Sequence, residues 1–279
     1  FQIDMGLLVG IGLGGTAISI PMSIVGKHFP LSNRTIAMSL VTAVGSFGYF
    51  ISPLYTAYSL ENSGWIDTLY IFTIFLVIGL VIAFFVRSPS LSESLETPSN
   101  QNTMSALKEA FKTKSYVLLT AGFFVCGFHI TLVGTHVPTY VIDRGLESWT
   151  AAAILSLIGL FNIFGSLLSG YLSTKMKKKV ILSALYTLRG ISICLFIFLP
   201  ASNINAFIFG ASFGFLWLST VPATSGIVAH IFGTKHLGLL YGIVFLSHQI
   251  GSFFGSFLGG LFHDIYGSYD YAWYLAIVL

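Results

Sequence analysis

RSPSLSESLETPSNQNTMSALKEAFKTK, residues 87–114, divides a chain of 279 residues that otherwise consists of long apolar runs with short polar breaks. This stretch holds seven of the chain's 23 Asp, Glu, Lys and Arg residues. Its first part, residues 88–102, is rich in Ser, Pro and Asn, which is typical of a solvated linker. Its second part, residues 103–114, predicts a short helix on a membrane surface, with Leu107 and Phe111 on the apolar face.

The composition outside this stretch indicates an integral membrane protein. Hydrophobic residues make up 55% of the chain and charged residues 8%, whereas a soluble domain carries roughly a quarter charged residues. Cys126 and Cys194 lie in apolar runs without the spacing of a disulfide or a metal pair, so no metal and no cofactor are expected. The expected partners are the lipid bilayer and a small-molecule substrate, with no nucleic acid, and the expected state is a monomer.

Nine apolar runs predict nine membrane-spanning helices, and therefore an all-α, polytopic helical bundle. Eight runs have the roughly 20 residues that a helix needs to cross the hydrocarbon core, and the ninth stops with the chain. The strand-length alternation of an outer-membrane barrel is absent from the sequence. The predicted spans cover about residues 5–26, 34–57, 66–87, 115–141, 149–174, 179–200, 204–232, 237–263 and 270–279.

The basic residues predict the orientation of these spans. When the breaks are assigned alternately to two sides, eleven of the 13 Lys and Arg residues fall on one side. Only Arg144 falls on the other side, and Arg189 lies inside a span. By the positive-inside rule, residues 88–114 are cytoplasmic, while residue 1 and residues 143–147 are external. The expected location is the plasma (inner) membrane, with multiple passes.

An internal repeat predicts the domain organisation. The paired landmarks are Pro21 and Pro222, Gly45 and Gly251, and Trp65 and Trp273, at spacings of 201, 206 and 208 residues. Spans one to three therefore match spans seven to nine, and the repeat unit is six helices. The expected domains are 1–87, the last three helices of an N-terminal six-helix domain, the linker 88–114, and a C-terminal six-helix domain over 115–279. Three helices are expected ahead of Phe1, so the fragment alone is expected not to transport.

Polar residues near mid-depth of the spans form the candidate site. Lipid cannot hydrogen-bond them, so each must face another helix, water or a substrate. The substrate-binding candidates are His129, Asn162, Trp217, Thr220, His248 and Arg189. His129 and His248 are also proton-coupling candidates, because histidine titrates near physiological pH. The alternative is that each side chain makes only a structural hydrogen bond between helices.

Two further features of the spans concern packing and charge. Small residues form stripes that let helices approach closely: Gly6, Gly10 and Gly14; Gly159, Asn162, Ser166, Ser169 and Ser173; and Gly251, Gly255 and Gly259. Arg189 is the one fixed charge at the centre of a span, and no Asp or Glu lies in the middle of any predicted span. Its possible partners are backbone carbonyls, an acid on other helices, or an anionic substrate.

Four stretches resemble bacterial members of the major facilitator superfamily that are related to monocarboxylate transporters. They are CGFHITLVGTHVPTYVIDRGL (126–146), LIGLFNIFGSLLSGYLSTKMKKK (157–179), FGFLWLSTVPATSGIVAHIFG (213–233) and GIVFLSHQIGSFFGSFLGG (242–260). The resemblance covers the whole chain as the family's fourth to twelfth helices. It implies secondary active transport by alternating access, with a substrate cavity between two six-helix domains and a small organic anion such as a monocarboxylate as substrate. Proton coupling is a further option.

Three alternative functions remain, and each can be tested against this hypothesis. An intramembrane hydrolase would use Ser212 in the Gly-x-Ser-x-Gly pattern of residues 210–214, but that pattern needs a strand-to-helix elbow. Loss of hydrolysis in Ser212→Ala would identify such an enzyme. A channel would lack the saturable counterflow of a carrier. A carrier of the same superfamily that exports drugs or other metabolites would differ in substrate and direction.

Overall fold

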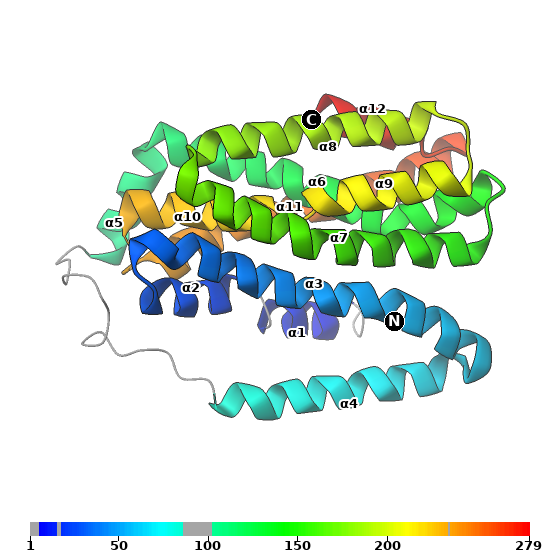
Figure 1. Cartoon of the computed structure of the whole chain (residues 1–279), viewed down its shortest axis with the longest axis horizontal. Coiled ribbons are helices and arrows are strands. Elements are labelled where there is room, and N and C mark those ends of the chain that lie inside the picture. Colours follow the sequence, from blue (N-terminus) through cyan, green and yellow to red (C-terminus); the bar gives the residue numbers. More distant parts are fainter. Residues whose placement is uncertain (1–5, 16–17, 86–101, 234) are drawn as a thin grey trace.

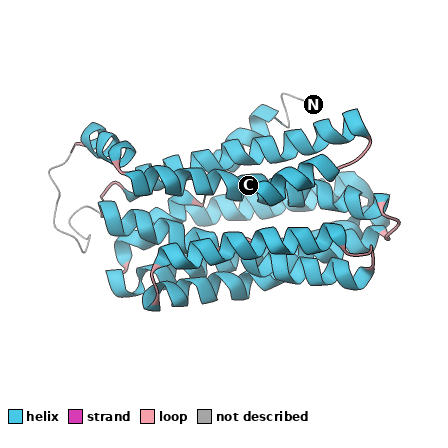
Figure 2. Cartoon of the chain, turned by 90° about the horizontal axis from the view of Figure 1, so that it is seen from above, coloured by secondary structure: helices cyan, strands magenta, loops and turns pink. Residues whose placement is uncertain are grey.

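The computed structural model describes residues 6–15, 18–85, 102–233 and 235–279, and these residues form helices without any strand (Figures 1 and 2). The helices are α1 (Val9–Gly15), α2 (Ser19–His28), α3 (Leu31–Asn62), α4 (Gly64–Phe85), α5 (Thr103–Lys112), α6 (Lys114–Asp143), α7 (Ser148–Lys175), α8 (Lys178–Phe198), α9 (Asn203–Leu216), α10 (Thr220–Phe232), α11 (Leu237–Tyr266) and α12 (Asp270–Val278). The long helices run side by side along the long axis of the molecule (Figure 1). The predicted all-α bundle is confirmed.

Seven of the nine predicted spans are long and apolar enough in the described residues to cross a membrane. They comprise α3, α4, α6, α7, α8, α11 and the combined segment of α9 and α10, residues 203–232. The first predicted span is described as the two short helices α1 and α2, and residues 16–17 between them lie outside the description. The ninth is α12, with nine residues. The count of nine spans therefore stays a prediction.

The seventh predicted span, residues 204–232, is not one continuous helix. Helix α9 ends at Leu216 and α10 begins at Thr220. Pro222 explains the interruption, because proline has no N–H to donate and its ring collides with the carbonyl four residues earlier, that of Leu218. The Leu218 carbonyl instead accepts from the Val221 amide at 3.0 Å. Pro21 likewise stands third in α2, as Pro222 does in α10, which agrees with the sequence repeat.

Glycines allow neighbouring helices to touch backbone to backbone. A Cβ on Gly251 of α11 would overlap the Phe124 carbonyl of α6, and one on Gly127 of α6 would overlap the His248 carbonyl of α11. On α7, a Cβ on Gly159 would overlap the backbone of Phe50 in α3. The predicted packing role is therefore confirmed for Gly159 of α7 and for the glycine stripe of α11. Gly6 and Gly10 have nothing within 4 Å of such a Cβ in the described residues.

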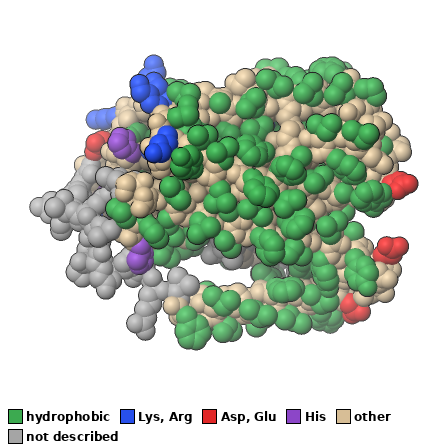
Figure 3. Space-filling model, viewed as in Figure 1, with side chains coloured by type: hydrophobic (Ala, Val, Ile, Leu, Met, Phe, Trp, Pro, Cys, Tyr) green, Lys and Arg blue, Asp and Glu red, His purple; other side chains and the backbone are tan. Residues whose placement is uncertain are grey.

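The charges separate to the two ends of the bundle. Figure 3 shows Lys and Arg side chains at the end that carries α5, and most of the visible Asp and Glu side chains at the opposite end. Helix α5 is present as predicted, but its buried residues are Ala106 and Ala110 rather than Phe111, which is 56% exposed. The ring of Phe111 packs edge-on against Tyr116, the third residue of α6. The small alanines let α5 lie close against the bundle.

Helix α3 joins the first part of the chain to the bundle. It lies along α7, while α4 packs on the far side of α3 and is almost entirely exposed (Figure 1). One interhelical bond, between the Ser59 and Thr68 hydroxyls at 2.7 Å, connects α3 to α4. The main apolar core lies among α6 to α12, with large buried residues such as Phe213 and Trp273. The contact of α3 with α7 therefore brings residues before the linker against residues after it.

Candidate functional site

The break between α9 and α10 leaves backbone groups without helical partners in an apolar interior, and side chains from other helices bind them. The Arg189 Nη2 of α8 donates to the carbonyls of Leu216 at 2.7 Å and Trp217 at 2.6 Å. The Ser169 hydroxyl of α7 donates to the Ser219 carbonyl at 2.6 Å. Buried backbone groups without a partner are costly, so these bonds allow the break to exist within the bundle.

Asn162 of α7 connects this break to α3. Its side-chain oxygen accepts from the Leu218 amide at 2.8 Å, and its side-chain nitrogen donates to the Ser46 hydroxyl of α3 at 2.6 Å. Ser46 in turn donates to the Thr42 carbonyl within its own helix. Both ends of the Asn162 amide are therefore used, one for the broken helix and one for the contact between α3 and α7.

Aromatic and polar side chains surround the break on its remaining sides. The Trp217 ring lies 5.7 Å from the Tyr49 ring of α3 and 5.5 Å from the Phe213 ring, between ring centroids. The Thr220 hydroxyl lies 3.3 Å from the Cys126 sulfur of α6. Helices α3, α6, α7, α8 and the two halves of the broken helix thus all meet at this place.

The two candidate histidines of the spans are buried in different surroundings. The Nε2 of His129 lies 2.7 Å from the Ala276 carbonyl, so this ring faces α12 rather than the break. His248 stacks on Phe245 with ring centroids 5.2 Å apart, and its Nδ1 lies 3.1 Å from the Gln249 side-chain oxygen. In the described residues the His129 Nδ1 and the His248 Nε2 have no hydrogen-bond partner. One nitrogen of each ring is therefore buried.

The structure thus brings four of the six candidates together and sets two apart. Asn162, Trp217 and Thr220 gather at the break with Arg189, whose guanidinium lies on its α8 side. His129 faces α12, and His248 lies on α11 against Phe123 of α6. All six side chains are at most 5% exposed, so in this conformation each is buried in the protein interior. Their role in substrate binding stays a prediction.

Sequence reasoning missed Ser46, Tyr49 and the break itself. Ser46 and Tyr49 stand on a span with many small and aromatic residues, and nothing in the local pattern separates them from packing residues. Ser169 appeared in the predicted packing stripe, but its bond to the Ser219 carbonyl depends on the break. Pro222 was the available signal, since a proline inside a predicted span marks a point where a carbonyl loses its partner.

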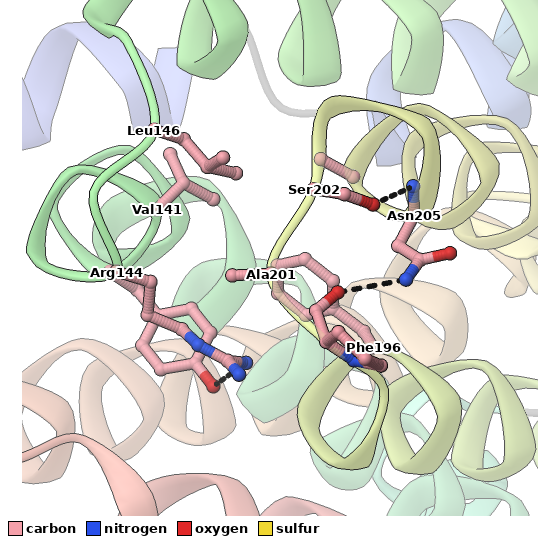
Figure 4. Close-up of a pocket in the computed structure, with 10 residues that line it drawn as sticks. Val141, Arg144, Leu146, Phe196, Ala201, Ser202 and Asn205 are labelled. Carbon is pink, nitrogen blue, oxygen red and sulfur yellow. Dashed lines mark hydrogen bonds between the residues drawn. The ribbon is translucent and has the colours of Figure 1, made fainter.

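The hollow drawn in Figure 4 belongs to a turn rather than to a substrate site. It lies between the end of α6 and the α8–α9 connection, and its volume is about 10 Å³, room for about one water molecule. Arg144 points across it and donates to the Tyr140 hydroxyl at 3.0 Å and to the Ile197 carbonyl at 3.3 Å. Arg144, the single Lys or Arg residue assigned to the external side, therefore binds a backbone carbonyl at the C-terminal end of α8.

Ser212 lies within helix α9, which does not fit the hydrolase alternative. Its hydroxyl donates to the Phe209 carbonyl at 3.2 Å and lies 2.8 Å from the Ser192 hydroxyl. A Cβ on Gly214 would come within 2.5 Å of the Ile158 backbone, so the glycine allows close packing of α9 on α7. The pattern of residues 210–214 is therefore a helix-packing pattern here.

The sequence profile of the Major Facilitator Superfamily matches residues 5–221 and 163–279. The chain belongs to this superfamily. The fold is that of solved members: the fucose:proton symporter of Escherichia coli aligns with 93% of this chain and 70% of its own, with a TM-score of 0.71 at 15% sequence identity. The family and the fold are those of a transporter rather than an enzyme.

Three curated relatives match between 63% and 98% of this chain. An uncharacterised MFS-type transporter, YcxA of Bacillus subtilis (strain 168), is 26% identical over 92% of this chain and 65% of its own length. Monocarboxylate transporter 13 of Rattus norvegicus is 24% identical over 98% of this chain and 63% of its own length. A cis,cis-muconate transport protein of Acinetobacter baylyi is 25% identical over 63% of this chain and 46% of its own length. This chain therefore spans slightly less than two thirds of the length of the first two relatives and less than half of the third.

Proposed function

We propose that this protein is a secondary active transporter of a small organic anion, such as a monocarboxylate, that works by alternating access. The observation that carries the proposal is the contact of α3 with α7. Through Asn162, this contact is joined to a broken helix that polar side chains line in the middle of the bundle. Small residues such as Gly159 keep the two helix surfaces close and smooth, which suits sliding or rocking of one part against the other.

The proposed division of the chain follows from the same contact. Residues 1–87 supply helices of one domain, residues 88–114 form the linker, and residues 115–279 supply the second domain. An organic anion is favoured by the carboxylates named for two of the relatives, and the positive end of the α10 helix dipole lies at the break. No Asp or Glu among the described residues is buried, which agrees with an anionic substrate, since buried carboxylates would repel it.

Uptake by the complete gene product tests the proposal. Cells or proteoliposomes that contain it should take up radiolabelled lactate or pyruvate in a saturable manner, with counterflow, whereas labelled fucose serves as an uncharged comparison. If the transport is proton-coupled, an inward proton gradient raises the rate, and His129→Gln or His248→Gln removes the dependence on pH.

A histidine outside the interior provides the control for this test. His263 lies at the acidic end, 3.7 Å from the Asp143 carboxylate and 37% exposed at its side chain. His263→Gln should keep the pH dependence of the wild type. Saturable uptake with the same pH dependence in His129→Gln and His248→Gln would show that these histidines serve packing only, and absence of any saturable anion uptake would refute the substrate class.

The orientation of the chain is a separate prediction. We expect residues 88–114 in the cytoplasm and residues 143–147 outside, because the Lys and Arg residues collect at the end that carries α5. In a background without Cys126 and Cys194, single cysteines at Ser94 and Ser148 are treated in whole cells with an impermeant maleimide. Ser94 lies outside the described residues, and Ser148 is exposed at the start of α7. Labelling at position 148 alone is expected, and labelling at position 94 alone would reverse the topology.

A further inference from the structure

One peptide group in the broken helix is held from both of its sides. The carbonyl of Trp217 and the amide of Leu218 belong to the same planar peptide unit. Arg189 of α8 binds the oxygen at 2.6 Å, and Asn162 of α7 binds the N–H at 2.8 Å. In a trans peptide these two groups point in opposite directions, so the two side chains approach the unit from opposite sides.

Arg189 is committed to the protein backbone in this arrangement. It is fully buried, its Nη2 bridges the Leu216 and Trp217 carbonyls, and the rings of Tyr186 and Phe213 flank the guanidinium at 5.4 Å and 5.8 Å. Its carbonyl partners form the C-terminal end of α9, where the helix dipole favours a cation. Among the described residues no carboxylate pairs with it, and its Nε and Nη1 have no partner. The charge is thus offset chiefly by the end of α9.

Asn162 links the same peptide unit to α3. Its nitrogen donates to the Ser46 hydroxyl at 2.6 Å, and Ser46 lies on the face of α3 that packs against α7. The side chain of Trp217, the residue that supplies the carbonyl of this peptide, also contacts Tyr49 of α3 through its ring. A continuous chain of contacts therefore runs from Arg189 through the 217–218 peptide and Asn162 to Ser46.

We propose that the Trp217–Leu218 peptide group couples the α9–α10 break to the contact of α3 with α7, with Arg189 and Asn162 as its two positioning residues. A planar peptide cannot rotate at its carbonyl without rotating at its amide, so loss of one bond loosens the other. A shift of α3 along α7 that pulls on Asn162 therefore reorients the break, and with it the first turn of α10. The coupling itself does not depend on the proposed function, but its role in transport rests on that function. In this proposal Arg189 positions the peptide and is not a substrate ligand.

Hydrogen–deuterium exchange in the purified protein tests the coupling without any substrate. Peptides that span residues 216–220 are compared for the wild type, Ser46→Ala and Arg189→Leu. Neither substituted side chain touches the Leu218 amide, yet both substitutions should raise its exchange rate, by roughly threefold for the loss of one interhelical hydrogen bond. Ser247→Ala is the control, because this serine also donates between helices, to the Thr120 carbonyl at 2.9 Å, away from the break.

The outcomes separate coupling from a purely local role. Unchanged exchange at residues 216–220 in both Ser46→Ala and Arg189→Leu would overturn the proposal, and Ser46→Ala keeps the test decisive if Arg189→Leu does not fold. In lactate uptake, Arg189→Leu should lower the maximal rate without raising KM. Arg189→Lys should recover part of the maximal rate, because the lysine ammonium can still donate to one of the two carbonyls. A rise in KM alone would make Arg189 a substrate ligand instead. If the wild type transports no anion, the proposed function fails while the exchange result still decides the coupling.

Discussion

Gly251→Ala is expected to prevent α11 from packing on α6 and to destabilise the protein by about 3 kcal/mol. A single methyl group is enough, because a Cβ at this position would overlap the Phe124 carbonyl and lie 3.1 Å from the Phe128 amide nitrogen. Both obstacles are backbone atoms, so no side-chain rotation can relieve them. For a chain of this size the melting temperature in detergent should fall by roughly 10 °C, which fluorescence-detected size-exclusion chromatography after heating can measure.

Gly242 provides the matched control in the same helix. A Cβ on Gly242 would meet nothing within 4 Å among the described residues. Alanine is intrinsically about 1 kcal/mol more favourable than glycine inside a helix, so Gly242→Ala should match or slightly exceed the wild-type melting temperature. Equal melting temperatures for the two variants would mean that α11 and α6 are not in backbone contact at Gly251.

Asn162→Leu is expected to abolish transport and to lower stability by roughly 2–3 kcal/mol. Leucine fills a similar volume but cannot bind the Leu218 amide or the Ser46 hydroxyl, and an unsatisfied buried donor costs about 1–3 kcal/mol. The loss should show in both lactate uptake and the melting temperature, because one residue supports the break and the contact of α3 with α7.

Ser156→Ala on the same helix is the comparison for this variant. Ser156 is 3% exposed, and its hydroxyl has no hydrogen-bond partner in the described residues. Removing that hydroxyl leaves no group unsatisfied, so uptake should stay at the wild-type value and the melting temperature should match or exceed that of the wild type. If Asn162→Leu behaves like Ser156→Ala in both measurements, the interhelical role assigned to Asn162 is wrong.

The sequence by itself determined the class of fold, because a bilayer leaves a chain few options. An apolar run must form a helix to satisfy its own backbone, and about 20 residues are needed to cross, so run length predicts spans. The repeat was equally visible, since Pro21 and Pro222 recur with Trp65 and Trp273. Charge position predicted two distinct ends, and Figure 3 shows them, because charged residues cannot remain in hydrocarbon.

Only the tertiary structure decided what each buried polar residue does. Periodicity placed His129 on an inner face, but which helix lies opposite depends on how the bundle is rotated, and α12 supplies the Ala276 carbonyl there. Arg189 had three possible kinds of partner in the sequence, and the backbone carbonyls at the C-terminal end of α9 proved to be the ones within reach. The bonds at the break join residues from 27 to 116 positions apart, and such pairs are set by packing between helices rather than by any local pattern.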